Sequence, residues 1–223
     1  MVKVSIMTKG ITRERIVATA LEMLDEHGMD ALTVRALATA LDVRAPALYW
    51  HVRNKQELLD EMATEVMRRV GVALSTCGFD GDWRDDLCAY ARILRSEFLK
   101  HRDGARIFSG TRLSDPNVLQ TKEVWFARWT GAGMPLVDAD DAVDLVTAFV
   151  VGFVIEEQER RQSSEDDPAR YSLAERDAWL GKESLLVREA GHARDDGDRR
   201  FDRQLGIVLD GIAARMDDAV PRG

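Results

Sequence analysis

Apolar residues recur at helical spacing along nearly the whole chain, and this pattern narrows the possible folds more than any other feature. In the first such segment, one helix face collects Ile16, Val17, Ala20, Leu21 and Leu24. No segment alternates apolar and polar residues over the length of a strand, and the 223 residues include only five prolines. The sequence therefore predicts an all-α protein.

Capping residues and glycines place the ends of several helices. Thr12 can cap the first helix and Gly28 can end it, and Asn54 with Glu57 forms a capping box. The predicted helices span about residues 12–27, 33–41, 45–51, 54–70, 82–98, 117–130, 138–160, 172–190 and 199–217, with a short segment at 104–110. Residues 161–170, which are polar and acidic, are predicted to form a mobile loop.

The chain is predicted to divide into two domains. Short helices up to residue 70 give way to longer ones beyond it, so we expect a small domain at 1–70 and a larger one at 71–223.

The 138–160 helix is apolar nearly all round, which indicates burial in more than one layer of a helix bundle. The last helix adds an apolar stripe of Phe201, Leu205, Val208, Leu209, Ile212 and Met216. These two helices offer more apolar surface than one small core can bury, so we expect a homodimer with an isologous four-helix contact.

Charge is unevenly distributed along the chain. The net charge is −8, but residues 1–70 hold ten Lys and Arg against ten Asp and Glu, so the whole deficit lies in residues 71–223. Residues 33–56 carry four basic side chains against Asp42 alone. A local basic patch of this kind favours a polyanionic partner over a membrane.

Several classes of protein do not fit the sequence. The longest nearly continuous apolar run, Leu145–Ile155, is too short to span a bilayer, and no secretory signal is evident. Cys77 and Cys88 lack metal-site spacing and are expected to be reduced thiols in the cytoplasm. The four histidines are scattered, and neither a glycine-rich phosphate loop nor a nucleophile elbow occurs. We therefore expect a cytoplasmic protein with no metal site, no cofactor and no catalytic centre.

Residues 33–51 have the features of a helix-turn-helix. Ala38 is small where the second helix approaches the third, and Asp42 stands at the turn, where it tolerates a left-handed backbone. Arg35, near the start of the second helix, either reaches a guanine edge or is a solvated surface residue. The pattern alone also fits any helical hairpin.

The helix after this turn favours DNA binding. Pro46 suits a first helical turn, and Leu48 alone has a clear role in the core. Tyr49, Trp50 and His51 have no clear role in the core. Tyr49 and Trp50 either pack against the first helix or face DNA.

On the DNA-binding interpretation, each of these side chains has a role. Tyr49 and His51 would meet phosphates, and Pro46 and Ala47 would contact a thymine methyl group. Lys55 would pair with a phosphate beside the N-terminus of its helix.

The run Leu-Tyr-Trp-His-Val-x-Asn-Lys at Leu48–Lys55, within Leu32–Ala63, resembles the DNA-binding domain of the TetR family of bacterial transcriptional regulators. The resemblance is strongest to its tetracycline-repressor branch. It implies an all-helical homodimer whose third helices enter successive major grooves of a double-stranded operator. The candidate DNA-binding residues are Arg35, Arg44, Ala45, Pro46, Ala47, Tyr49, Trp50, His51 and Lys55. Arg44 and Ala45 differ from the polar base readers of the best-known members, so the operator sequence does not carry over.

Two further stretches are similar to the effector-binding domain of that branch. His101–Arg112 resembles the segment that lines the effector pocket, and Gly152–Glu159 resembles the helix that the other subunit contributes. Within them Thr111, Arg112 and Glu156 match the branch.

Three positions depart from the tetracycline-repressor pattern. Phe108 stands where a histidine holds the drug's magnesium ion, and a phenyl ring cannot bind a metal. Tyr90 and Gly71 replace two other drug contacts. The resemblance therefore implies the same scaffold with an effector other than magnesium–tetracycline.

The candidate effector-binding residues are mostly apolar, which favours a largely apolar small molecule with few polar groups. They are Trp83, Tyr90, Leu94, Phe108, Thr111, Arg112, Trp125, Phe149, Phe153 and Glu156. Any of the apolar ones can instead be ordinary core, and Arg112 and Glu156 can instead pair with each other or with neighbours.

The sequence thus predicts a ligand-responsive repressor that binds a palindromic operator as a homodimer, its third helices about 34–36 Å apart. One alternative is an all-α small-molecule-binding protein or enzyme with no DNA role. Another is a TetR-like activator.

Overall fold

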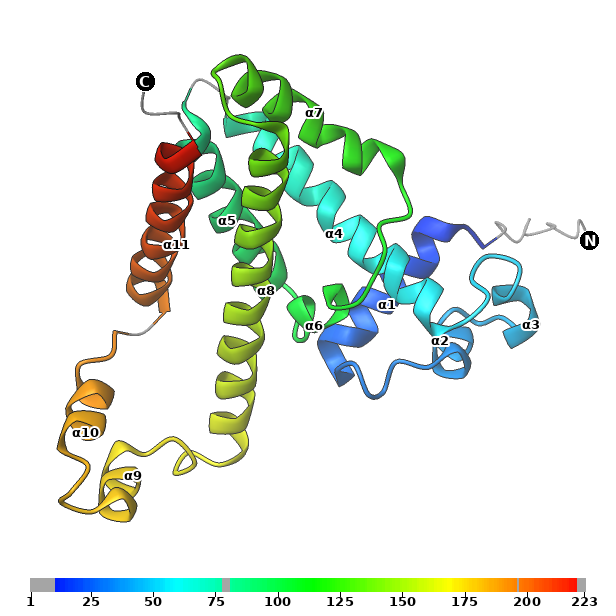
Figure 1. The fold of residues 1–223 in the computed structure, drawn as a ribbon. Helices are drawn as coiled ribbons and strands as arrows, with labels where there is room; N and C mark the ends of the chain where they lie inside the picture. Colours follow the sequence, from blue (N-terminus) through cyan, green and yellow to red (C-terminus); the bar gives the residue numbers. More distant parts are fainter. Residues whose placement is uncertain (1–10, 78–80, 196, 220–223) are drawn as a thin grey trace, which may run out of the picture.

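The computed structural model describes residues 11–77, 81–195 and 197–219. Over these residues the chain is all-α, as predicted (Figure 1). The helices are α1 (Arg13–His27), α2 (Val34–Ala40), α3 (Ala45–Leu48), α4 (Lys55–Cys77), α5 (Trp83–Leu99), α6 (Gly104–Phe108), α7 (Pro116–Gly131), α8 (Leu136–Asp166), α9 (Leu173–Leu180), α10 (Leu185–His192) and α11 (Gly197–Ala219).

Helices α1, α2 and α3 form a small unit, here called the head (residues 11–54), at the right of Figure 1. Local capping explains their boundaries: Thr12 and Thr33 each accept a backbone N–H three residues on, and Gly28 ends α1 with a positive φ of 76°. Between α2 and α3 the left-handed residue is Asp42, with a φ of 53°. The predicted helix-turn-helix is therefore present.

Helices α5–α8 and α11 form a larger unit, here called the body. Helix α8 packs against α5, α6, α7 and α11, and its buried side is a line of small apolar residues from Ala139 to Val154. Arg95 on α5 ties three helices together, because it pairs with Glu157 on α8 and Asp198 on α11. Helix α4 links the two units, since it packs against α1 in the head and against α5, α6 and α7 in the body.

Helices α9 and α10 pack on each other as a hairpin, here called the arm (residues 167–195), which Figure 1 shows set apart from the body at the lower left. Asp177 on α9 holds the hairpin through Arg176, Arg188 and His192. The hydrogen bond from His192, with that from Arg176, lowers the pKa of Asp177 to about 2.

Four predicted boundaries were wrong. The predicted 54–70 helix continues to Cys77, because buried Leu74 extends its apolar stripe. Residues 161–166 continue α8 instead of starting a loop, because intrahelical hydrogen bonding outweighs their polar composition. The predicted 172–190 helix is two helices, since Gly181 has a φ of 70° and ends α9. Helix α3 ends at Leu48 and is followed by turns, so the predicted 45–51 helix was too long.

The predicted division into domains at residue 70 remains a prediction. Helix α4 runs without a break from Lys55 to Cys77, so no helix end marks that position.

Cys88 is a free thiol, whereas the side chain of Cys77 lies outside the described residues. Among the helices of the described ranges, none combines the length and the apolar character needed to cross a membrane.

Candidate DNA-binding surface and effector cavity

The nine candidate DNA-binding residues share one property: each is exposed or half-exposed. Trp50 is 90% exposed and Tyr49 is 51% exposed, whereas the neighbouring Leu48 is fully buried. The alternative that Trp50 packs against the first helix was therefore wrong. A large exposed aromatic ring beside a buried leucine indicates a contact surface.

The backbone presents these side chains from a short, fixed support. Arg44 is the N-cap of α3 in an extended conformation, and Pro46 lies in the first turn. The backbone N–H of Val43 donates to Ala38 O (3.0 Å), which closes the turn between the two helices. Leu48 then fixes α3 to the core, so the exposed residues have a defined direction.

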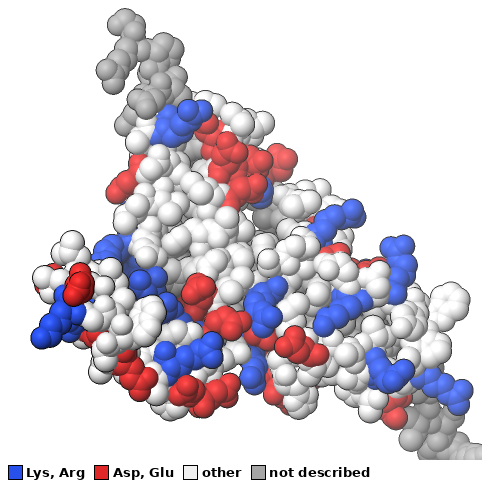
Figure 2. Space-filling model, turned by 60° about the horizontal axis from the view of Figure 1, so that its bottom comes forward, with Lys and Arg blue, Asp and Glu red and all other residues white. Residues whose placement is uncertain are grey.

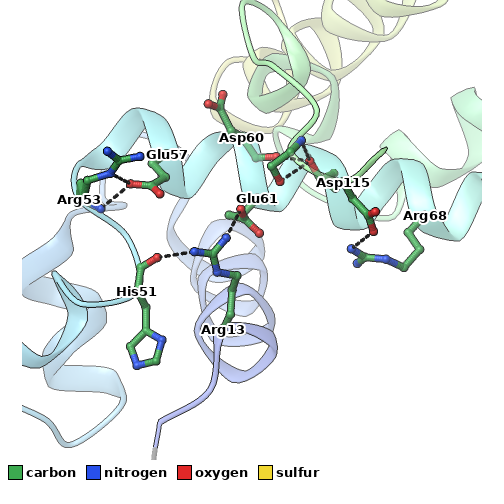
Figure 3. Close-up of polar contacts among 10 residues, drawn as sticks. Arg13, His51, Arg53, Glu57, Asp60, Glu61, Arg68 and Asp115 are labelled. Carbon is green, nitrogen blue, oxygen red and sulfur yellow. Dashed lines mark hydrogen bonds and ion pairs between the residues drawn. The ribbon is translucent and has the colours of Figure 1, made fainter. Parts of the chain in front are cut away.

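Polar contacts fix the segment after α3 against α1 and α4 (Figure 3). Arg13 on α1 donates to the backbone carbonyl of His51 (3.0 Å) and to Glu61 on α4 (2.6 Å). The imidazole of His51 points away from these contacts (Figure 3). At the start of α4, the backbone N–H of Arg53 donates to Glu57 and lowers the pKa of that carboxyl group.

Lys55 lies at the N-terminus of α4, where its ammonium group donates to the carbonyl of Met29 (3.2 Å). Figure 2 shows Lys and Arg side chains spread over the surface of the N-terminal helices at the lower right, with few acidic neighbours. An exposed aromatic and basic surface around a helix-turn-helix is suited to a nucleic-acid backbone.

A second set of contacts joins the head to the body. Asp25 near the end of α1 accepts from His101 Nδ1 (2.9 Å) and from the backbone N–H of Arg102 (3.1 Å). Asp103 accepts from the backbone N–H of Met29 (2.8 Å). The bend between α5 and α6 therefore holds the end of α1 directly.

Helix α8 holds this same bend from the other side. The buried side chain of Gln158 donates to the carbonyls of Phe98 (3.1 Å) and His101 (2.7 Å) and accepts from the N–H of Ala105 (3.4 Å). At Gly104 an added Cβ would lie 2.2 Å from Phe98 O, so a larger residue does not fit this close turn.

The segment before α7 is attached to α4. The carboxylate of Asp60 accepts from the N–H of Arg112 (3.0 Å), and Asp115 accepts from Arg68 (3.0 Å) (Figure 3). This ion pair lowers the pKa of Asp115. A shift of α4 must therefore also move the segment that leads into α7.

A small cavity, here called the inner cavity, lies among α4, α5, α7 and α8. Its volume is about 40 Å³, and Gly71, Tyr90, Trp125 and Val143 are among the residues that line it. Tyr90 donates to or accepts from Thr147 Oγ1 (2.8 Å), and its ring meets Trp125 edge-on at 5.4 Å. Burial raises the pKa of Tyr90 to about 12.

Comparison with known proteins identifies both parts of the chain. Residues 16–62 match the family described as bacterial regulatory proteins, tetR family. Residues 79–216 match the family described as tetracyclin repressor-like, C-terminal domain. The chain belongs to the TetR family.

Other TetR-family proteins align with almost the whole chain. The tetracycline repressor protein class A from transposon 1721 of Escherichia coli is 38% identical, and the alignment covers 94% of this chain and 93% of that protein. A solved structure of a possible TetR-family transcriptional regulator from Streptomyces coelicolor is 36% identical, with a TM-score of 0.76 over 91% of this chain and 99% of that one. The structure of BioQ with its double-stranded DNA operator is 31% identical, with a TM-score of 0.64 over 92% and 99% of the two chains.

The predicted effector-binding residues of this TetR-family chain lie in several places. Tyr90 and Trp125 line the inner cavity, and Trp83 lines a separate cavity at the N-terminal end of α5. A groove of about 370 Å³ between α8 and α11 contains Phe149, Phe153 and Glu156.

The other four candidates line none of these spaces. Leu94 is fully buried core, and Phe108 packs against Phe98 with ring centres 5.5 Å apart. Thr111 donates to the carbonyl of Phe108 (2.7 Å), and the backbone of Arg112 contacts Asp60.

Sequence analysis did not identify several residues that line the inner cavity. They come from the second half of α4, from the segment before α7 and from the first turns of α7: Met67, Val70, Leu74, Leu113, Val118 and Lys122. The helix predicted at 54–70 includes Met67 and Val70 but was not assigned to a cavity, and it stops short of Leu74. Within the part of the chain that the structure describes, no three His, Cys, Asp or Glu side chains are arranged to hold a metal ion.

Proposed function

We propose that this TetR-family chain is a repressor that binds a palindromic operator as a homodimer and leaves it when a small molecule other than magnesium–tetracycline binds the body. The observation that carries the DNA-binding part is the Tyr49-Trp50-His51 run directly after the firmly supported α3, in which Tyr49 and Trp50 are exposed and His51 is partly exposed. The complex of the related BioQ with its double-stranded operator supports the same use of the head.

In this proposal, α3 lies in the major groove. Tyr49, His51 and Lys55 bind phosphates, while Pro46 and Ala47 contact base edges. The exposed guanidinium groups of Arg35 and Arg44 are suited to guanine edges. Trp50 packs against the sugar–phosphate backbone.

The unpartnered faces of α8 and α11 support the homodimer. Leu145 on α8 is 51% exposed and Ile207 on α11 is 66% exposed, and the groove between the two helices is lined by Phe149 and Phe153. A second copy would cover these residues with the same surface, which is an isologous contact.

The inner cavity is our proposed effector site. At about 40 Å³ it is far smaller than the roughly 300–1,000 Å³ typical of ligand pockets, so a ligand must separate α4 from α7 in order to enter. Because α4 packs against α1 of the head, this separation would tilt the head and change the distance between the two α3 helices. The phenyl ring of Phe108, packed on Phe98, offers no metal ligand, which supports an effector bound without magnesium.

We further propose that the protein acts in the bacterial cytoplasm, where its operator DNA lies, and that it is a regulator and not an enzyme. The membership of the TetR family supports this role.

The test is selection of binding sites from random duplex DNA by the purified protein at one fixed physiological salt concentration. We expect an inverted repeat whose half-sites lie about one helical turn apart. The double variant Tyr49→Ala/Lys55→Ala should lose at least 100-fold in affinity for the selected site and remain a dimer by light scattering. The matched control Tyr171→Ala/Lys182→Ala changes the same residue types in the arm, and it should bind as the wild type does.

Two results would contradict the proposal. One is a folded dimer that enriches no sequence, even after bound ligands have been removed by unfolding and refolding. The other is a monomer at micromolar concentration, because a single head cannot read both halves of a palindrome.

A further inference from the structure

A second cavity, here called the outer cavity, lies at the end of the body where α7 turns into α8, away from the head (top of Figure 1). Its volume is about 370 Å³, whereas that of the inner cavity is about 40 Å³. The outer cavity is thus within the size range of small-molecule sites without any movement of the helices.

The walls of the outer cavity are aromatic and apolar. The indole of Trp83, the first residue of α5, is half-buried, and the indole of Trp129 near the end of α7 is buried. Met134, Pro135 and Met216 complete the lining. Two indoles and two thioethers form a polarizable surface that favours contact with a flat aromatic ring.

The charged groups at this cavity are already compensated. Asp86 is buried, accepts a hydrogen bond from Trp129 Nε1 (2.8 Å), and forms an ion pair with Arg128. The carboxylate of Asp82 caps α5 by accepting from the N–H groups of Arg84 (2.8 Å) and Asp85 (3.0 Å). With these charges paired or capping, the site favours an uncharged ligand over an ionic one.

The rim of the outer cavity is fixed by backbone hydrogen bonds. The N–H groups of Ala132, Gly133 and Met134 donate to carbonyls in the last turn of α7, at 3.0 to 3.1 Å. Gly133 has a φ of 100°, a conformation that other residues rarely adopt. The cavity is therefore held open by the turn itself.

We infer that the outer cavity is a second ligand site, separate from the proposed effector site, and that it takes a flat, uncharged aromatic molecule. Trp125, which lines the inner cavity, stacks on Trp129, which lines the outer one, with ring centres 5.6 Å apart and an interplanar angle of 12°. The two sites therefore share one wall of paired indoles.

The test uses N-phenyl-1-naphthylamine, an uncharged aromatic dye, titrated into the full-length protein and followed by dye fluorescence. Trp83→Ala removes one wall and Ala132→Phe fills the cavity, and each should weaken saturable dye binding at least tenfold. Trp179→Ala removes an indole that is 83% exposed on the arm and should leave binding unchanged. Gly71→Leu fills the inner cavity and should also leave dye binding at the outer cavity unchanged.

Thermal unfolding of each variant shows whether it is folded. If Ala132→Phe does not fold, Trp83→Ala alone tests the site. The inference is overturned if the wild type shows no saturable binding. It is also overturned if folded Trp83→Ala binds the dye as tightly as Trp179→Ala does, or if Gly71→Leu is the variant that abolishes binding.

Discussion

Gln158 is the residue whose replacement tests most directly how the body is held to the head. Its amide is buried and makes three hydrogen bonds to the backbone of the bend between α5 and α6. The bend in turn holds α1 through Asp25 and Asp103. Gln158→Leu keeps a similar volume but removes all three bonds.

The expected cost follows from those contacts. The buried N–H of Ala105 loses its partner, which costs about 1–3 kcal/mol unless water reaches it. The carbonyls of Phe98 and His101 each lose one hydrogen bond but keep a backbone donor, from His101 and Gly104. With one of the three bonds already long at 3.4 Å, we expect a loss of roughly 2–4 kcal/mol in the free energy of unfolding. For a chain of this size, that loss lowers Tm by roughly 5–15 °C.

The assay is thermal unfolding followed by circular dichroism at one chain concentration, because the stability of a dimer depends on concentration. The matched control is Gln162→Leu, one turn further along α8, where the partly exposed amide donates to the carbonyl of Arg102 (2.8 Å) and to Asp103 Oδ1 (3.3 Å). Water can reach this site and replace both bonds, so we expect a loss below about 1 kcal/mol. Equal shifts of Tm in the two variants would refute the argument that Gln158 clamps the bend.

Three other substitutions test separate parts of the structure. Trp50→Ala should change the free energy of unfolding by less than about 0.5 kcal/mol, because the ring is 90% exposed, yet weaken operator binding at least tenfold in a gel-shift titration. The buried phenol of Tyr90, whose pKa is about 12, contributes its full stabilisation below pH 10. This contribution is lost between pH 10 and 12, because the phenol of the unfolded chain ionises first, so in denaturant titrations Tyr90→Phe should not show this fall in the free energy of unfolding. Asp177, with a pKa of about 2, supports the arm fully above pH 4 and loses this effect as the pH falls toward 2. Asp177→Asn should therefore speed hydrogen exchange in residues 173–192 at pH 7, and unchanged exchange would show that the pairing with His192 does not hold the hairpin.

The sequence predicts best the features that depend on local chemistry. The caps Thr12, Thr33 and Asp82 act on backbone groups within three residues, so helix starts at α1, α2 and α5 were placed within one residue. The exposed aromatic residues after Leu48 were recognised because a single short helix has one core-facing position and little room to bury others.

Features that depend on packing between distant segments were not predictable in this way. The residues Phe149 and Phe153 have the apolar character of a pocket, but they face the groove toward α11 because α8 buries its valine side against α5. Likewise, the role of Gln158 requires the bend at Gly104 to lie against α8, which no local pattern reveals.

Helix α4 is the element through which effector and operator binding are coupled in the proposed function. It is 23 residues long, about 34 Å, and it runs from the head along the inner cavity. Its first half packs on α1 through buried residues such as Leu58 and Met62, and its second half lines the cavity through Met67 and Leu74. A ligand that moves the second half must therefore move the first, and the operator complex favours only one of the two positions. Linkage then requires that operator DNA weaken effector binding by the same factor as the effector weakens operator binding, an energy of typically about 1–3 kcal/mol.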